Sequence, residues 1–144
     1  MSTFNKKAKF EYNLEPDRYE SGLVLSGGEA KAIRTGHADI STAVCRILND
    51  EVFLINANIP VQGATKYVPT RSRKLLLHRD EIISIRTRAK QRKLTLVPVK
   101  LYTKGRLVKL ELALGTPKHK FEKRALIMKK DIERDIAREL KGRI

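Results

Sequence analysis

Residues 94–114, LTLVPVKLYTKGRLVKLELAL, decide the fold, because they contain the clearest β-hairpin of the chain. In the second half of this stretch, apolar residues alternate with Lys109 and Glu111, as expected of a strand that covers a core with one face. Residues 103–106 join this strand to the preceding one. Pro98 has no N–H for the strand ladder, which predicts an edge position or a β-bulge there.

Shorter β-segments precede the hairpin. Residues 10–14 alternate like a half-buried strand, which residues 15–17 (Glu-Pro-Asp) should break. Residues 42–48 and 51–59 are β-rich runs separated by an Asn-Asp pair that suits a two-residue hairpin turn. Together these segments predict a mainly β protein with short helices (α+β), built as a small β-barrel or a strongly twisted sheet.

Two helices are predicted among these strands. Residues 29–34 form a short helix that begins near Ser26 or Gly28 and ends at Gly36. This helix is expected to place three charged side chains at the surface: Glu29, Lys31 and Arg34. Residues 80–92 form a longer helix whose apolar face consists of Ile82, Ile83, Ile85 and Ala89.

The chain is expected to divide into a folded domain, residues 1–116, and a basic tail, residues 117–144. In the tail, an apolar residue recurs every fourth position: Met128, Ile132, Ile136 and Leu140. A stripe one side chain wide docks weakly, and an isolated helix of this length is marginal in water. We therefore expect the tail to be loose when free and helical when bound. The alternative is a helix packed on the domain.

Charge is strongly segregated along the chain. The 31 Lys and Arg residues against 16 Asp and Glu residues give a net charge of +15. Residues 1–65 carry seven basic and eight acidic side chains, whereas residues 66–109 carry fourteen basic and two acidic ones. Solubility does not require such segregation, but a polyanionic partner does. Nucleic acid is the leading candidate, and acidic protein surfaces or anionic membranes are the alternatives.

The sequence contains no convincing catalytic set. His37, His78 and His119 lack metal-ligand spacing, so we expect no metal and no cofactor. Cys45, the only cysteine, alternates within a predicted strand and is expected to be a small core residue. The carboxylates are scattered rather than gathered as in a two-metal nuclease. We expect a protein that is not an enzyme, with a metal-dependent nuclease as the alternative.

Three features that the sequence lacks indicate the cellular compartment. No apolar run approaches the roughly 20 residues of a membrane helix, and residues 1–10 lack the apolar region of a signal peptide. A single cysteine cannot form an internal disulfide, which suits a reducing environment. We expect a cytoplasmic protein without a membrane partner.

Basic and aromatic side chains together favour RNA as the partner. Five basic residues are candidates for phosphate contacts: Arg71, Arg73, Lys74, Lys100 and Lys109. Four tyrosines are candidates for stacking on unpaired bases, although each alone is more often a core or rim residue: Tyr12, Tyr19, Tyr67 and Tyr102. The residues by themselves indicate a basic β-barrel that binds structured RNA, and they do not identify the RNA.

The chain contains, in order, NKKAKFEYNLE, YESGLVLSGGEAKAIRTG, VFLINANIP, PTRSRKLLLH, LTLVPVKLYTKGRLVKLELAL and KFEKR. In this order the segments resemble the small protein B family, the SsrA-binding partner of tmRNA in trans-translation. The resemblance implies an OB-fold-like barrel that binds the tRNA-like domain of tmRNA as a monomer, one-to-one, and delivers it to stalled ribosomes. It also implies a C-terminal tail that enters the vacant decoding centre and mRNA channel, among rRNA. Another basic β-barrel, such as a ribosomal protein or a general single-strand binder, is the alternative.

The resemblance also implies site residues. It ties Asn5, Glu20, Leu76 and Lys109 to tmRNA binding. Eight further residues of the surrounding motifs are expected to take part in RNA binding: Lys6, Lys7, Glu29, Lys31, Arg34, Arg71, Arg73 and Lys74. Seven tail residues are expected to contact the ribosome: Phe121, Lys123, Arg124, Lys129, Lys130, Arg134 and Arg138. Lysine and arginine position phosphates, whereas Glu20 can accept from a base amino group or a ribose hydroxyl.

Three departures from the family pattern stand out. Ala30 and Ala32 replace the usual Val and Ser beside Lys31, and residues 117–119 (Pro-Lys-His) carry one charge fewer than the usual Gly-Lys-Lys. Phe121 stands where Tyr or His is frequent. A role that needs a hydroxyl or imidazole is therefore in doubt at this position, whereas stacking on an rRNA base is retained.

Residues 69–78, PTRSRKLLLH, combine a basic cluster with a leucine run. Arg71, Arg73 and Lys74 are expected either to meet the RNA or to hold the adjacent loop. Alternation predicts Leu75 and Leu77 in the core. It leaves Leu76 facing outward, where it can pack against an RNA loop.

Overall fold

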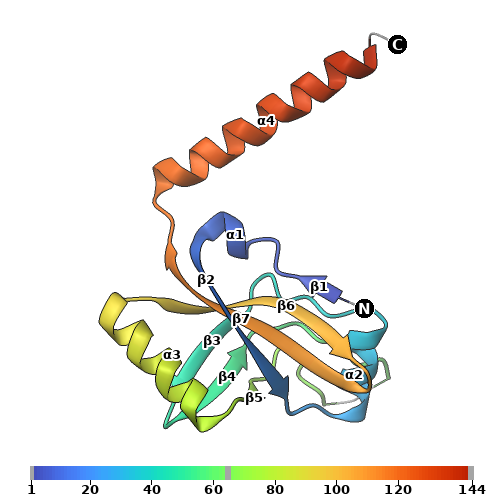
Figure 1. The fold of residues 1–144 in the computed structure, drawn as a ribbon. Coiled ribbons are helices and arrows are strands. Elements are labelled where there is room, and N and C mark those ends of the chain that lie inside the picture. Colours follow the sequence, from blue (N-terminus) through green and yellow to red (C-terminus); the bar gives the residue numbers. More distant parts are fainter. Residues whose placement is uncertain (1, 64–65, 143–144) are drawn as a thin grey trace.

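The computed structural model describes residues 2–63 and 66–142, and within its last helix the side chains of residues 120–122 and 139–142 lie outside the description. The elements, in chain order, are β1 (Ser2–Phe4), α1 (Ala8–Glu11), β2 (Tyr12–Leu23), α2 (Gly27–Arg34), β3 (Val44–Leu48), β4 (Glu51–Ile55), β5 (Arg73–Leu76), α3 (Arg79–Arg92), β6 (Thr95–Lys104), β7 (Leu107–Pro117) and α4 (Lys120–Gly142). Figure 1 shows a curved sheet with α2 and α3 at its margins and α4 projecting from it.

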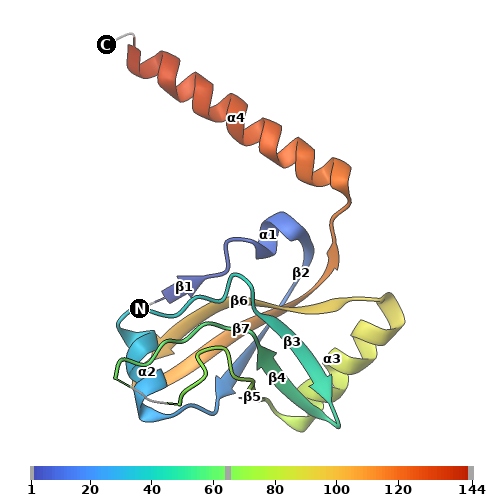
Figure 2. The ribbon, with the colours of Figure 1, turned by 180° about the vertical axis from the view of Figure 1, so that it is seen from behind.

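The strands form one antiparallel sheet in the order β1-β6-β7-β2-β5-β4-β3. The sheet curls on itself, as the two opposite views show (Figures 1 and 2). Its edge strands, β1 and β3, are not paired with each other among the described residues. The predicted fold class, mainly β with short helices and OB-fold-like, is confirmed, with an unclosed sheet.

The β6–β7 hairpin supplies much of the core, as its sequence predicted. Val108, Leu110, Leu112 and Leu114 are buried, whereas Lys109 and Glu111 point to the outer face of the sheet. The pairing register shifts between Pro98 and Lys100, which marks the predicted bulge. The bulge, one of the two predicted alternatives, is thus confirmed. Strand β6 lies between β1 and β7, and β1 pairs only with residues 100–102 of it, beyond Pro98.

Strand β2 differs from its prediction in two ways. Phe10 belongs to the short helix α1, and β2 starts only at Tyr12. The strand then continues through residues 15–17, where a register shift against β7 replaces the predicted break. The bulge accommodates Pro16, which has no N–H to donate. On the partner strand, a Cβ added at Gly115 would lie 2.9 Å from the carbonyl oxygen of Asn13, so the two backbones approach too closely there for any side chain.

The β3–β4 turn is formed as predicted. Asn49 and Asp50 have φ angles of 50° and 62°, which a type I′ hairpin turn requires at both central positions. Cys45 on β3 is buried in the core, also as predicted.

The helices have clear start and stop signals. The Ser26 hydroxyl accepts from the backbone N–H of Glu29 at 3.3 Å, and the Ser26 N–H donates to the Glu29 carboxylate at 2.9 Å, which forms a capping box on α2. Gly36 follows the helix with a φ of 80°, as a C-terminal stop requires. On α3, Ile85 is buried, but Ile83 is 43 % exposed, so the predicted apolar face is narrower than expected.

Helix α4 extends away from the sheet (Figure 1). It is attached at its start, where the backbone N–H of Lys118 donates to the Glu11 carbonyl at 2.8 Å. Met128, Ile132 and Ile136 are exposed, so the described part of the predicted stripe does not pack on the domain. The side chain of Leu140 lies outside the described residues. That the tail is loose in the free protein stays a prediction.

Candidate nucleic-acid interface

Three neighbouring strands bring predicted RNA-binding residues into one row on the outer face of the sheet. Gly22 on β2 pairs with Leu76 on β5 and, on its other side, with Lys109 on β7. Glu20 precedes Gly22 by two positions, so it lies on the same face. The row therefore joins Glu20, Leu76 and Lys109, which are far apart in sequence.

This row lines a groove, which we call the β2–β5–β7 groove. A hollow of about 570 Å³ is lined by Glu20, Gly22, Leu76, Leu77, His78, Glu81 and Lys109. A second hollow of about 240 Å³ shares Gly22, Leu76 and Lys109 with the first and adds Arg106 and Leu107. Leu76 is 52 % exposed, whereas Leu75 is 2 % exposed, as alternation predicted. The structure thus presents an exposed apolar side chain in a groove that also contains cationic and anionic ones.

Glu20 is held in its charged form at the end of the groove. The Tyr102 hydroxyl donates to one of its carboxylate oxygens, and Lys104 Nζ lies 3.7 Å from the other. The hydrogen bond from Tyr102 lowers the pKa of Glu20, and the positive charges of Lys104 and Lys109 act in the same direction. A charged carboxylate accepts hydrogen bonds from base amino groups and ribose hydroxyls.

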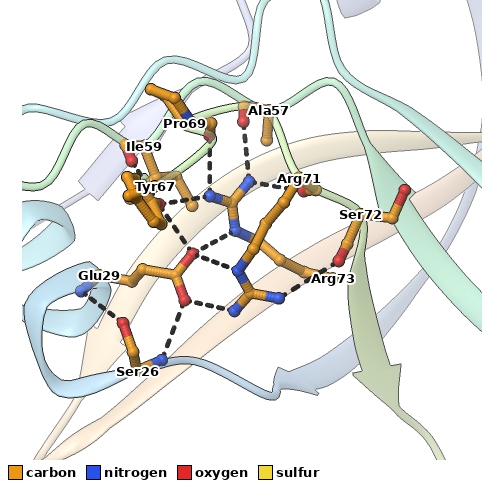
Figure 3. Close-up of polar contacts among 9 residues, drawn as sticks. All are labelled: Ser26, Glu29, Ala57, Ile59, Tyr67, Pro69, Arg71, Ser72 and Arg73. Carbon is orange, nitrogen blue, oxygen red and sulfur yellow. Dashed lines mark hydrogen bonds and ion pairs between the residues drawn. The ribbon is translucent and has the colours of Figure 1, made fainter. Parts of the chain in front are cut away.

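Glu29 is not at the surface, in contrast to its prediction. Its side chain is fully buried and accepts hydrogen bonds from two arginines (Figure 3). Arg73 Nε lies 2.7 Å from Oε2, Arg71 Nε lies 3.1 Å from the same oxygen, and a second Arg71 nitrogen donates to Oε1. The Tyr67 hydroxyl lies 2.9 Å from Oε2. Burial in a low-dielectric interior requires such pairing.

Arg73 uses all five of its N–H donors inside the protein. Besides Nε to Glu29, Nη1 donates to the carbonyls of Ala57 and Arg71 at 2.8 and 3.0 Å. Nη2 donates to the Tyr67 hydroxyl and to the Pro69 carbonyl, both at 2.8 Å. No donor is left for a phosphate. Of the two roles predicted for Arg73, holding the adjacent loop is the one that this geometry supports. A part of Arg73 and Glu29 in RNA binding stays a prediction.

The pKa of Glu29 reflects this network. Burial alone would raise it, because the charged carboxylate loses its water. The hydrogen bonds from Arg71, the Ser26 backbone, Arg73 and Tyr67 outweigh burial and lower the pKa to about 2. The network ties α2 to the segment before β5 and so fixes the strand that carries Leu76. Tyr67, a stacking candidate from the sequence, is one of its members.

Asn5 is also a structural residue. It is 8 % exposed, its Nδ2 donates to the Pro98 carbonyl at 2.8 Å, and its Oδ1 accepts from the Lys7 backbone at 3.2 Å. It thus satisfies a carbonyl at the β6 bulge, and its part in tmRNA binding stays a prediction. Lys6 and Lys7, which follow it, are exposed.

The other predicted basic residues lie at the surface. Lys74 is on β5 and lies 3.4 Å from Glu51, in an exposed ion pair. Lys31 and Arg34 are on α2, and Arg34 donates to the Arg106 carbonyl in the β6–β7 turn. In α4, Arg124, Lys129, Lys130, Arg134 and Arg138 are exposed and Lys123 is half-buried. The side chain of Phe121 lies outside the described residues.

The described part of the chain gives little support for a metal site, a reactive thiol or a membrane-spanning helix. It contains no group of three or more His, Cys, Asp or Glu side chains placed to hold a metal ion. Burial raises the pKa of the Cys45 thiol, which keeps it from acting as a thiolate. None of the described helices has the length and apolar character needed to cross a membrane.

Sequence reasoning missed Gly22 and the link between Tyr102 and Glu20. Both depend on cross-strand pairing, since Gly22 matters only because it lies between Leu76 and Lys109. Residues 22–25 (Gly-Leu-Val-Leu) give no sign in the sequence that Gly22 lies between these two residues. The alternation of Tyr102 with buried Leu101 could have placed Tyr102 on the outer face.

The curled basic sheet, the outer groove and the projecting basic helix define a small β protein of the nucleic-acid-binding class. The profile of the SmpB protein family matches residues 2–142, so the chain belongs to this family. This family membership agrees with the resemblance found in the sequence motifs.

Individual relatives are similar over nearly their whole length. The SsrA-binding protein of Chloroflexus aggregans is 44% identical over 97% of this chain and 90% of its own length. That of Rubrobacter xylanophilus is 42% identical over 100% of this chain and 99% of its own. A solved structure described as "tmRNA-SmpB: a journey to the center of the bacterial ribosome" has a TM-score of 0.66 and 33% identity, over 83% of this chain and 85% of that one.

Proposed function

We propose that this chain is a non-enzymatic adaptor that binds the tRNA-like domain of tmRNA, one-to-one, and delivers it to stalled ribosomes in trans-translation in the cytoplasm. The relatives named SsrA-binding protein and the similar structure of tmRNA with SmpB support the choice of RNA. The observation in this chain that carries the proposal is the β2–β5–β7 groove.

The groove has the chemistry that structured RNA loops require. Lys109 and Arg106 provide cations for phosphates, and exposed Leu76 provides an apolar contact for an unpaired base. Glu20, whose carboxylate accepts from the Tyr102 hydroxyl, can also accept from a base edge or a 2′-hydroxyl. An exposed leucine beside a lysine and a glutamate suits contact with a splayed RNA loop.

The tail has a separate part in the proposal. Helix α4 projects from the domain with its basic side chains exposed, so it can reach a second RNA while the groove holds the first. We assign the second RNA to the rRNA of the vacant decoding centre and mRNA channel. The domain is then residues 1–116 and the tail residues 117–144, with the connection at the end of β7.

The deciding experiment is a gel-shift competition with the tRNA-like fragment of tmRNA from the same organism. Unlabelled fragment should displace the labelled one far better than bulk tRNA or oligo(U) does. Lys109→Glu should abolish the complex, because it inverts the charge at the centre of the groove. Lys90→Glu changes the net charge equally at an exposed position of α3 that does not line the groove, and it should bind like the wild type. Equal competition by bulk tRNA or oligo(U) would instead indicate a general RNA binder.

A further inference from the structure

A second cluster on the outer face lies at the β1 edge of the sheet. Lys100 and Tyr102 were candidates from the sequence, whereas Phe4 was not. Phe4 on β1 pairs directly with Lys100 on β6. It is 61 % exposed, which makes it the most exposed of the aromatic side chains that the structure describes. Such exposure gives Phe4 little part in the core and leaves most of its ring accessible to a partner.

Lys100 links this ring to a second one. Its Nζ lies 5.2 Å from the centroid of Phe4 and 5.2 Å from the centroid of Tyr102, within the range of cation–π attraction. The side chain of Lys100 is therefore held beside the exposed ring rather than extended into solvent. An aromatic face with an adjacent fixed ammonium is the pair of groups that binds an unpaired nucleotide, with the base on the ring and the phosphate on the cation.

The cluster is continuous with the β2–β5–β7 groove. Tyr102 pairs with Lys109 across β6 and β7, and its hydroxyl donates to Glu20. Strand β5, which carries Leu76, and strand β1, which carries Phe4, are four strand spacings apart in the sheet. At the usual spacing of 4.7–4.9 Å this is about 19 Å. One nucleotide cannot contact both Leu76 and Phe4 across this distance. The β1 edge would therefore receive a different nucleotide from the one beside Leu76.

We propose that Phe4 and Lys100 form a stacking platform for a second unpaired nucleotide of the bound RNA, with the base on the Phe4 ring and its phosphate on Lys100. The proposal rests on the RNA-binding function proposed above and adds a second contact point to it. The cation on the platform and its continuity with the groove favour RNA over a protein partner.

The absence of tryptophan from the chain allows a direct test. Phe4→Trp keeps an aromatic platform and introduces a single tryptophan, whose fluorescence should change when the tRNA-like fragment binds. Leu48→Trp is the matched control, because Leu48 is 54 % exposed on β3, at the opposite edge of the sheet. Its fluorescence should not respond to the same RNA. Both variants should bind the RNA as the wild type does.

Two further variants measure the contribution of each group. Phe4→Leu keeps an apolar side chain on β1 but removes the π face, and it should bind about 5- to 150-fold more weakly, the loss of one stacked base. Lys100→Gln should reduce the slope of log affinity against log salt by about 0.7, the loss of one phosphate contact on a single strand.

The outcomes separate the two proposals. Wild-type protein that fails to bind the fragment would overturn the proposed function itself. Wild-type binding, with no fluorescence response in Phe4→Trp and unchanged affinity in Phe4→Leu, would overturn the platform alone. A fluorescence response of Phe4→Trp that appears only with RNA-free ribosomal proteins or translation factors would also overturn it, because the occupant would then be a protein.

Discussion

At the scale of single residues, Glu29 and Arg73 form an ion pair whose side chains are both fully buried. Glu29→Gln keeps the shape of the side chain but leaves the Arg73 guanidinium without its counter-charge. Removing one partner of a buried pair costs about 3–5 kcal/mol. We expect the free energy of unfolding, measured by urea denaturation, to fall by about this amount. RNA affinity should fall only as far as the folded fraction does.

Glu51→Gln is the control for this change. It removes the carboxylate from an ion pair with Lys74 in which both side chains are nearly half exposed, 48 and 45 %. Exposed pairs contribute about 0–1 kcal/mol, so this variant should unfold near the wild-type midpoint. A Glu29→Gln protein as stable as Glu51→Gln would contradict the structural role of the network.

The low pKa of Glu29 also predicts an acid dependence of stability. Its pKa is about 2 in the folded protein, against a reference value of 4.5. Because the folded pKa is the lower one, the unfolded chain binds the proton first as the pH falls. The contribution of Glu29 is complete above about pH 4.5 and is lost between about pH 4.5 and 2. Wild type and Glu29→Gln should therefore differ less in denaturation midpoint at pH 2.5 than at pH 6, and a constant difference would contradict this.

Leu76 provides a prediction about binding rather than stability. Leu76→Asp places a negative charge in the groove, beside the expected phosphates, and should weaken RNA binding by at least about tenfold, or about 1.4 kcal/mol. Its thermal midpoint should change little, because the side chain is exposed. Leu75→Asp is the matched control: it buries an unpaired charge and should prevent folding. Unfolding of Leu76→Asp would show that Leu76 belongs to the core.

At the scale of elements, α4 is the part that can be removed without disturbing the sheet. The described part of its apolar stripe is exposed, and its attachment is the short segment around Lys118. A chain that ends at Arg124 should keep its RNA affinity within about twofold, because the lost tail charges are distant from the groove. It should lose peptide tagging of stalled nascent chains. Loss of RNA binding together with tagging would contradict a separate role for the tail.

A charge variant refines the test of α4. Lys130, Arg134 and Arg138 recur every four residues and so lie along one side of the helix. Replacing all three with glutamine keeps the helix and should reduce tagging in a reconstituted translation reaction. Undiminished tagging would show that this side of α4 does not contact rRNA.

At the scale of the whole molecule, the net charge of +15 should appear in the salt dependence of binding. Each phosphate contact releases counterions, and about six contacts weaken binding by about a thousandfold between roughly 50 and 200 mM salt. Affinity for the tRNA-like fragment, measured by filter binding over this range, should follow such a slope. A nearly flat dependence would contradict binding through phosphates.

Local periodicity made a large part of the fold predictable. The alternation in β7 and the Asn49-Asp50 turn are each determined by residues close in sequence, and each was found as expected. Ser26, one of the two predicted starts of α2, is its N-cap. The contrast between Leu75 and Leu76 was predictable for the same reason, because successive side chains of a strand point to opposite faces. Continuous strands through Pro16 and Pro98 were harder to predict, because a bulge depends on the partner strand.

A basic, mainly β chain with an outward-facing Leu76 and a basic helical tail could be predicted from residues close together in the sequence. Which charged residues reach the surface depends on the packing of distant segments. Arg73 and Glu29 are separated by 44 positions, and the sequence does not reveal that they meet. A buried charge requires its partner within hydrogen-bond distance, and that distance exists only after folding. The same holds for the row of Leu76, Gly22 and Lys109, which three strands bring together.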